Sequence, residues 1–295
     1  MLDYRAIEAV QAVLNLQSFE KAAAELHITQ SAVSQRIKNL ESFYGEPVLI
    51  RTLPYRTTDL GAHLLRQLTQ VQILEKNFAL ERTISLAKPK ISIAINRDSL
   101  ETWFINALGQ DLILDHVLLE ILADDQELTL DYFRRGLVSA CLSTRKEPLL
   151  GTEVTYLGSM DYILAASPSF MKRYSFKADY LKFFQVAPAL KFHENDHLHE
   201  RYFRQFFSLS LDIPYQIIPS VAGFKKYALL GYGYGLIPQI DIDQELKSGA
   251  LVNLFSDKIW QLPLYWHMWP INSQFYQEIN AQIIVSAQHR LRRPE

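Results

Sequence analysis

Four polar side chains near the N-terminus stand at the spacing of one helix face, at positions i, i+3, i+4 and i+7: Ser31, Ser34, Gln35 and Lys38. Val33, Ile37 and Leu40 occupy the opposite face of the same predicted helix. A helix with an apolar back and a front of hydroxyls, an amide and a cation can enter the major groove of DNA and hydrogen-bond to base edges. Any surface helix also has a polar face, so this pattern alone leaves both interpretations open.

Signals on either side of this helix favour the DNA-binding interpretation. Ser18 can cap a preceding helix and Thr29 can cap this one, which leaves only residues 27–28 as the turn between them. That arrangement predicts a helix-turn-helix. Gln30 lies at the helix N-terminus, where base contacts usually begin, and Arg36 lies on the flank, where a phosphate is the closer partner.

Residues 51–58 supply two further cations and several hydroxyls around Pro54. We expect a hairpin that contacts the DNA backbone or the minor groove as a wing. Four Lys and Arg residues stand against two Glu residues between positions 30 and 58, a local net charge of +2, although the whole chain carries −2. The positive charge is therefore local. The predicted DNA-binding residues are Thr29, Gln30, Ser31, Ser34, Gln35, Arg36, Lys38, Arg51 and Arg56.

Two further kinds of segment follow along the chain. Apolar residues recur at helical spacing from residue 59 to about 85, which predicts a long helix that pairs with a second copy as a coiled coil. Its seam consists of Leu60, Leu64, Leu68, Val71, Leu74 and Phe78. Pro89 ends this helix. Beyond it, short aliphatic runs alternate with amphipathic segments, which predicts parallel sheet covered by helices in two α/β lobes.

The expected positions of these elements follow from the same patterns. We expect strands near 91–96, 116–123, 137–143, 160–166, 186–192, 215–219, 234–237 and 262–268. We expect helices near 99–110, 126–135, 196–207, 222–231 and 271–290.

Polar side chains gather at the predicted carboxyl ends of the first two strands. Asn96 ends the first strand, and Ser99 begins the next helix, whose free N–H groups favour a carboxylate. Asp124 and Asp125 end the second strand and would attract an ammonium or a guanidinium group. Helix capping is the competing explanation for Ser99 and for Asp124, because Asp124 and Glu127 have the spacing of a capping box.

Two weaker candidates complete this predicted site for a small effector. Ser143 ends the third predicted strand, and Phe224 opens a helix of the second lobe. The predicted effector-binding residues are therefore Asn96, Ser99, Asp124, Asp125, Ser143 and Phe224. A basic amino acid fits this set, and an anionic or aromatic effector remains the alternative.

An enzyme is the competing class of function. His193, Glu194 and His197 match the HExxH pattern of zinc hydrolases, which needs both histidines on one face of a helix. Here His193 follows a strand-like run, and residues 195–196 are typical of a turn and a helix cap. We therefore predict no catalytic residue, no metal and no cofactor, and treat a zinc hydrolase as a remote alternative.

Composition limits the remaining possibilities. The chain of 295 residues is 48% hydrophobic and 21% charged, which is typical of a globular protein with more than one domain. Charged residues interrupt its apolar runs long before the ~20 residues of a membrane helix, and no secretory signal is visible. Cys141 has no second cysteine to pair with. We expect a cytoplasmic protein that does not bind membranes.

The segment from Phe19 to Glu41 resembles the winged helix-turn-helix of LysR-type transcriptional regulators, and so does the segment from Arg51 to Gly61. With the linker helix and the two-lobed region, the resemblance covers the whole chain. It implies a homodimer or homotetramer that binds double-stranded promoter DNA. It also implies an effector domain that is similar to periplasmic binding proteins and holds a small molecule between its lobes. RNA polymerase is a further candidate partner.

Shorter matches are similar to the ArgP/LysG branch of this family, whose members control basic amino-acid export and respond to lysine and arginine. The matching segments are 91–103, 133–136, 161–162 and 264–267. We therefore expect a regulator of amino-acid export or metabolism genes whose effector is lysine or arginine.

The predicted fold class is α/β with an N-terminal all-α winged helix-turn-helix. The predicted domains are a DNA-binding domain over 1–58, a dimerisation linker helix over 59–88 and a two-lobed effector domain over 89–295. Lobe I is expected at about 89–158 and 266–295, and lobe II at about 159–265.

Overall fold

The structure is a computed structural model that describes residues 2–81, 88, 90–109, 117–125, 128–176 and 179–293. Within the helix that ends at residue 81, the side chains of residues 73–74 and 76–81 are not described. The side chains of Leu74 and Phe78 of the predicted seam are therefore not described, and Glu127 of the predicted capping box lies outside the described residues. No helix in that part is both long and apolar enough to span a membrane.

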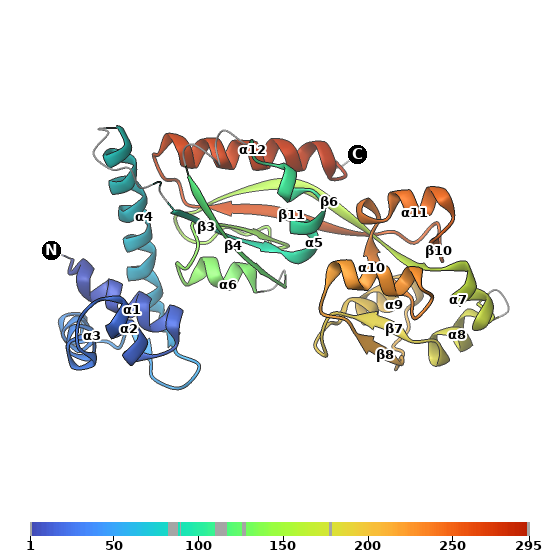
Figure 1. Cartoon of the computed structure of the whole chain (residues 1–295), viewed down its shortest axis with the longest axis horizontal. Coiled ribbons are helices and arrows are strands. Elements are labelled where there is room, and N and C mark those ends of the chain that lie inside the picture. Colours follow the sequence, from blue (N-terminus) through green and yellow to red (C-terminus); the bar gives the residue numbers. More distant parts are fainter. Residues whose placement is uncertain are drawn as a thin grey trace. The chain divides into compact units, whose positions relative to one another are not determined.

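The N-terminal segment folds as three helices, a two-stranded hairpin and a long helix (Figure 1). These elements are α1 (Tyr4–Leu16), α2 (Phe19–Glu25), α3 (Gln30–Tyr44), β1 (Leu49–Ile50), β2 (Arg56–Thr57) and α4 (Asp59–Glu81). Asp3, Ser18 and Thr29 cap the first three helices, and each side chain accepts a hydrogen bond from a first-turn backbone N–H. The helix-turn-helix and the hairpin are thus present where the sequence predicts them.

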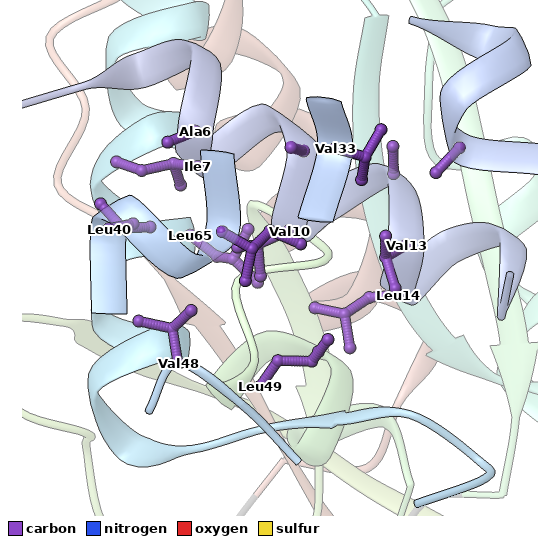
Figure 2. Packing of buried hydrophobic residues seen from close by; sticks show 14 of the residues in the cluster. Ala6, Ile7, Val10, Val13, Leu14, Val33, Leu40, Val48, Leu49 and Leu65 are labelled. Atoms are coloured by element: carbon purple, nitrogen blue, oxygen red, sulfur yellow. The ribbon is translucent and has the colours of Figure 1, made fainter. Parts of the chain in front are cut away.

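One apolar core holds this segment together. Figure 2 shows Val33 and Leu40 of α3 beside Val10 of α1, together with Val48 and Leu49 from the hairpin and Leu65 from α4. Helix α4 contributes three buried side chains to this core: Leu64, Leu65 and Leu68. The buried side of α3 leaves its polar side facing outward.

This packing corrects the predicted coiled-coil seam. Leu64 and Leu68 are 3% and 1% exposed in the core of the chain's own DNA-binding segment, and Leu60 packs against the same core. The first half of the seam is therefore buried in the chain's own DNA-binding core. Hydrophobic spacing reveals a buried face but does not reveal what covers it.

The chain is divided into two compact units. The first comprises residues 1–96, 106–156 and 265–286, and the second comprises residues 97–105, 157–264 and 287–295. Strands β6 (Glu153–Ala166) and β11 (Trp260–Met268) each run from one unit into the other.

The first unit also contains the first part of the effector region. Strand β3 (Lys90–Asn96) pairs in parallel with β4 (Leu118–Asp124) and β5 (Ala140–Ser143), while β11 pairs antiparallel with β5. Helix α6 (Thr129–Arg134) connects β4 to β5. Helix α12 (Gln274–Arg290) belongs to this unit up to residue 286, and its Asn280 accepts a 2.7 Å hydrogen bond from the buried indole of Trp266.

The second unit is built on the other end of β6. That end pairs antiparallel with β9 (Gly235–Pro238) and β10 (Val252–Asn253), and a separate parallel pair joins β7 (Ala189–Lys191) to β8 (Tyr215–Ile217). The helices of this unit are α5 (Arg97–Thr102), α7 (Pro168–Arg173), α8 (Tyr180–Val186), α9 (Leu198–Phe207), α10 (Val221–Leu229) and α11 (Asp243–Ser248).

Three predictions about these elements are wrong. The sheet is mixed and not parallel throughout, because β6, β9, β10 and β11 make antiparallel pairs. The predicted strand over 186–192 is shorter, since Val186 ends helix α8 and only 189–191 pair. The predicted helix over 99–110 is α5 followed by a short 3-10 turn at Phe104–Asn106, and it begins at Arg97.

A buried histidine makes the second unit sensitive to acid. His199 on α9 is 1% exposed, and its ring lies edge-on to Tyr234 at 5.7 Å between centroids. Neither ring nitrogen has a hydrogen-bond partner among the described residues. Burial is the main cause that lowers the pKa of His199 to about 4, and the charge of Lys191 acts in the same direction. The carboxylates of Asp196 and Glu200 oppose this shift.

We expect the stability of this unit to fall between pH 7 and pH 5. The unfolded chain takes up a proton near pH 6.5 that the folded chain excludes until about pH 4. His199→Gln should therefore reduce the loss of unfolding free energy between pH 7 and pH 5 by about 2 kcal/mol, as measured by urea denaturation. His197→Gln, at an exposed position, is the control. An unchanged pH dependence in His199→Gln would contradict the assignment.

Candidate nucleic-acid interface and small-molecule site

The polar side of α3 is accessible along most of its length. Thr29, Gln30, Ser31, Gln35 and Lys38 are exposed, and Ser34 and Arg36 are half-buried. The hydroxyl of Thr29 accepts from the N–H of Ala32 at 3.2 Å and lies 2.9 Å from the hydroxyl of Ser31. The cap and the outward face are thus one continuous polar surface that can meet base edges.

The Gln35 amide is held in place before any partner arrives. Its Nε2 donates a 2.7 Å hydrogen bond to Oδ1 of Asn39, one turn further along α3. Asn39 is exposed on the same side of the helix, four residues after Gln35, and the sequence analysis did not include it. Helical spacing was the signal that could have found it.

The hairpin of β1 and β2 is tied to the end of α3 by one carboxylate. Glu41 accepts a 3.1 Å hydrogen bond from the N–H of Val48 with Oε1 and pairs with Arg51 at 2.8 Å through Oε2. The Arg51 side chain remains 49% exposed, so it can also reach a phosphate. Arg56 is exposed and has no ion pair among the described residues.

A second brace comes from Gln17, which the sequence did not single out. Its Oε1 accepts a 2.6 Å hydrogen bond from the N–H of Tyr55, and its Nε2 donates to the carbonyl of Tyr55 at 3.1 Å. The Tyr55 ring also packs edge-on against Phe19 at 5.5 Å. No pattern relates positions 17 and 55, because only the folded backbone brings them together.

The predicted small-molecule residues of the first unit meet at one edge of its sheet. Asn96 lies opposite Asp124 in the parallel pair of β3 and β4, and Ser143 ends the neighbouring strand β5. Asn96 is 4% exposed, and its Oδ1 has no hydrogen-bond partner within the described ranges. The carboxyl ends of three strands therefore present polar groups together.

Ser99 lies inside the first turn of α5 and does not cap it. The helix begins at Arg97, directly after β3, and has only six residues. The Ser99 hydroxyl is buried, and the described part of the chain offers it no partner. Because burying an unpaired hydroxyl costs free energy, this atom and Oδ1 of Asn96 have the properties of groups that await a ligand.

Asp124 is held by a residue that the sequence analysis missed. The hydroxyl of Tyr132, on α6, donates a 2.5 Å hydrogen bond to Oδ2 of Asp124, and the N–H of Asp125 donates to Oδ1 at 2.9 Å. The hydrogen bond to Asp124 and burial raise the pKa of Tyr132 to about 12, so the phenol keeps its proton. Helix α6 begins at Thr129, and the side chain of its N-cap, Leu128, makes no capping hydrogen bond.

Two other predicted residues are used within the fold. The hydroxyl of Ser143 accepts from the N–H of Arg145 at 3.2 Å. The ring of Phe224 is 4% exposed within α10, lies parallel to Phe192 at 5.0 Å and rests on the backbone of Gly235. Phe224 is thus a core side chain of the second unit.

The HExxH residues do not share a helix face. His193 lies in the segment before α9, and His197 is the N-cap of that helix. Asp196 accepts hydrogen bonds from the N–H groups of Phe192 and Leu198, which makes this segment a capped turn. The geometry that a zinc hydrolase requires is therefore missing at these residues.

Comparison with known families matches the N-terminal segment. Residues 4–62 match the model described as "Bacterial regulatory helix-turn-helix protein, lysR family". The chain is 38% identical over 293 residues to the HTH-type transcriptional regulator ArgP of Vibrio vulnificus, with 98% of each chain covered. It is also 38% identical over 295 residues to ArgP of Aeromonas salmonicida, again with 98% of each covered.

Solved structures extend the similarity to the whole fold. ArgP from Mycobacterium tuberculosis superposes with a TM-score of 0.84 at 33% identity, with all of both chains covered. LysG from Corynebacterium glutamicum with bound effector arginine gives a TM-score of 0.79 at 28% identity, covering 99% of this chain and 100% of LysG. DarR from Vibrio fischeri in complex with DNA, at 15% identity and a TM-score of 0.51, shares the fold.

We expect Gln17→Ala to loosen the hairpin without unfolding the segment. The substitution removes both hydrogen bonds to the Tyr55 backbone, so the Tyr55 amide should exchange with solvent at least about tenfold faster. Hydrogen exchange followed by NMR measures this directly. Asn15→Ala is the control, because Asn15 is exposed near the end of α1, the helix that Gln17 follows. Equal exchange at Tyr55 in both variants would show that Gln17 does not brace the hairpin.

Proposed function

Because the chain belongs to the LysR family of DNA-binding transcriptional regulators, in the ArgP/LysG branch, we propose that arginine or lysine controls its binding to DNA. The genes it controls are those of amino-acid export or metabolism. The working form is a homodimer or homotetramer in the cytoplasm that binds promoter DNA and contacts RNA polymerase. It is a regulator and not an enzyme.

The observation that carries the effector proposal is the buried Oδ1 of Asn96, which has no hydrogen-bond partner among the described residues. An α-ammonium group can donate a hydrogen bond to this oxygen. That contact would satisfy an acceptor that the described residues leave unpaired. The bound arginine in LysG is a ligand of the same chemistry in a related protein.

The carboxylates at the end of β4 supply the preference for a cationic side chain. Asp124 keeps its orientation through Tyr132 and the N–H of Asp125, and its negative charge attracts a guanidinium or an ammonium. Asp125 follows directly and adds a second negative charge. We propose Asn96, Ser99, Asp124, Asp125 and Ser143 as effector contacts, and omit Phe224 because its ring is buried in the core.

The DNA contacts follow from the outward face of α3 and the hairpin. We propose that Ser31, Ser34 and Gln35 read base edges, with Thr29 and Gln30 at the helix start. We propose that Arg36, Lys38, Arg51 and Arg56 contact phosphates. Asn39 joins the first group because it holds the Gln35 amide.

We expect Asp124→Asn to weaken binding of arginine and lysine by about 10- to 100-fold, because it removes the charge of a charge-assisted hydrogen bond. Isothermal titration calorimetry on the full chain measures this. Asp131→Asn is the control, since Asp131 pairs with Arg135 on the same unit and is not part of the proposed site. Unchanged arginine affinity in Asp124→Asn would overturn its assigned role, and preferential binding of an anionic amino acid by the native chain would favour the alternative effector class.

We expect substitutions at Gln35 and Arg56 to affect sequence-specific and non-specific DNA affinity differently. Gln35→Ala should lower affinity for the native upstream operator about 5- to 100-fold and leave non-specific DNA binding unchanged. Arg56→Gln should weaken binding to all duplexes and reduce the salt slope by about one. Fluorescence anisotropy over a salt series on specific and scrambled duplexes separates them. Equal losses on both duplexes for Gln35→Ala would place that residue on the DNA backbone.

A further inference from the structure

Helix α4 contacts the turn that follows α6, far along the chain and within the same unit. The guanidinium of Arg66 donates a 2.9 Å hydrogen bond to the carbonyl of Arg134. The hydroxyl of Thr69 lies 2.9 Å from the carbonyl of Gly136 and 3.0 Å from that of Leu65, so it shares its proton between the two. Two side chains of the linker helix thus hold the carbonyls at the end of α6.

The backbone of this turn is shaped for that approach. Gly136 has φ +72°, and a Cβ at this position would lie 2.7 Å from the backbone nitrogen of Arg66 and 3.0 Å from the carbonyl carbon of Leu65. Any larger residue would push α4 away from the turn. The glycine at position 136 therefore allows the turn after α6 to approach the backbone of α4 this closely.

An aromatic stack continues the contact into the sheet. Arg66 lies over the ring of Trp269, with its guanidinium carbon 5.8 Å from the ring centroid. Trp269 is stacked on Phe133 of α6, with centroids 5.0 Å apart and an interplanar angle of 29°. Phe133 is fully buried, so α6 cannot shift without moving this stack.

Other side chains of α6 reach the strand ends of the proposed effector site. Tyr132 holds the carboxylate of Asp124. Thr129 donates from its hydroxyl to the carbonyl of Leu142, one residue before Ser143. One six-residue helix therefore touches the proposed effector edge through Thr129 and Tyr132, and meets α4 through the carbonyl of Arg134 and, by way of Trp269, through Phe133.

The other side of α4 belongs to the DNA-binding core. Leu64, Leu65 and Leu68 are buried there, on the same two turns of the helix that carry Arg66 and Thr69. A displacement of α4 at Arg66 and Thr69 therefore acts directly on the element that supports α1, α3 and the hairpin.

We propose that α6 is the relay that couples the effector site to the DNA-binding domain, and that Arg66 and Thr69 form its contact with the linker helix. The proposal rests on the effector assignment made above. When a ligand cation engages Asp124, the Tyr132 hydrogen bond readjusts, α6 moves, and the carbonyls of Arg134 and Gly136 shift against α4. The coupling is thermodynamic, so DNA should change effector affinity by the same factor as effector changes DNA affinity.

The test measures coupling separately from either binding step. Arg66→Met combined with Thr69→Val removes the contacts to Arg134, Gly136 and Trp269 while keeping apolar volume. We expect arginine affinity, and DNA affinity without arginine, to stay within about threefold of the native values. The arginine-induced change in DNA affinity, commonly 5- to 150-fold for allosteric pairs, should fall to less than twofold. Gln67→Met, on the same helix, is the control and should keep the native change.

A second measurement needs no effector. Tyr132→Phe removes the hydrogen bond to Asp124, and we expect it to raise hydrogen exchange at the amides of residues 65–69 as well as those of α6, by about threefold or more. Full coupling in the double variant, or faster exchange confined to α6 in Tyr132→Phe, would overturn the relay. A native chain that binds neither arginine nor lysine would contradict the proposed effector instead, and the exchange measurement would still decide the relay.

Discussion

The close approach of α4 to Val48, the residue before β1, is the constraint on which the DNA-binding segment depends. A Cβ at Gly61 would lie 2.0 Å from the carbonyl oxygen of Val48, so only glycine allows this contact. Thr58 fixes the start of α4 at the same place, because its hydroxyl donates to the carbonyl of Pro47 at 2.7 Å and accepts from the N–H of Gly61 at 3.1 Å. Leu64 and Leu68 then reach the core beneath α1 and α3.

The orientation of α3 and of the hairpin follows from this packing. Because Val33, Ile37 and Leu40 are buried against the same core, the opposite side of α3 faces outward. The hairpin is fixed at its base by Glu41 and at its far end by Gln17, each through paired hydrogen bonds. The cations and amides that we assign to DNA therefore stand on a rigid support, which limits the entropy lost when DNA binds.

The proposed effector edge combines groups that are fixed with groups that are unsatisfied. Asp124 is oriented by Tyr132 and by the N–H of Asp125, whereas the buried Oδ1 of Asn96 has no partner in the described part of the chain. Unpaired buried polar groups reduce the stability of the ligand-free protein, and a ligand that pairs them recovers this free energy on binding. Tyr132 of α6 holds Asp124, and Arg134 of the same turn meets α4, so the proposed effector site and the linker helix share one short helix.

Elements whose signals are local can be predicted from the sequence. The caps at Ser18 and Thr29, the polar face from Ser31 to Lys38 and the polar strand ends at Asn96 and Asp124 all lie within a few residues of the pattern that predicts them. Which surfaces meet follows only from the folded chain. In the folded chain Leu64 and Leu68 are buried in the DNA-binding core, Gln17 hydrogen-bonds to Tyr55, and Tyr132 hydrogen-bonds to Asp124. Phe224 packs in the core of the second unit, and Arg66 lies against Gly136. Periodicity tells which side of a helix is buried, but the partner of that side depends on residues tens of positions away, which only the folded chain brings into contact.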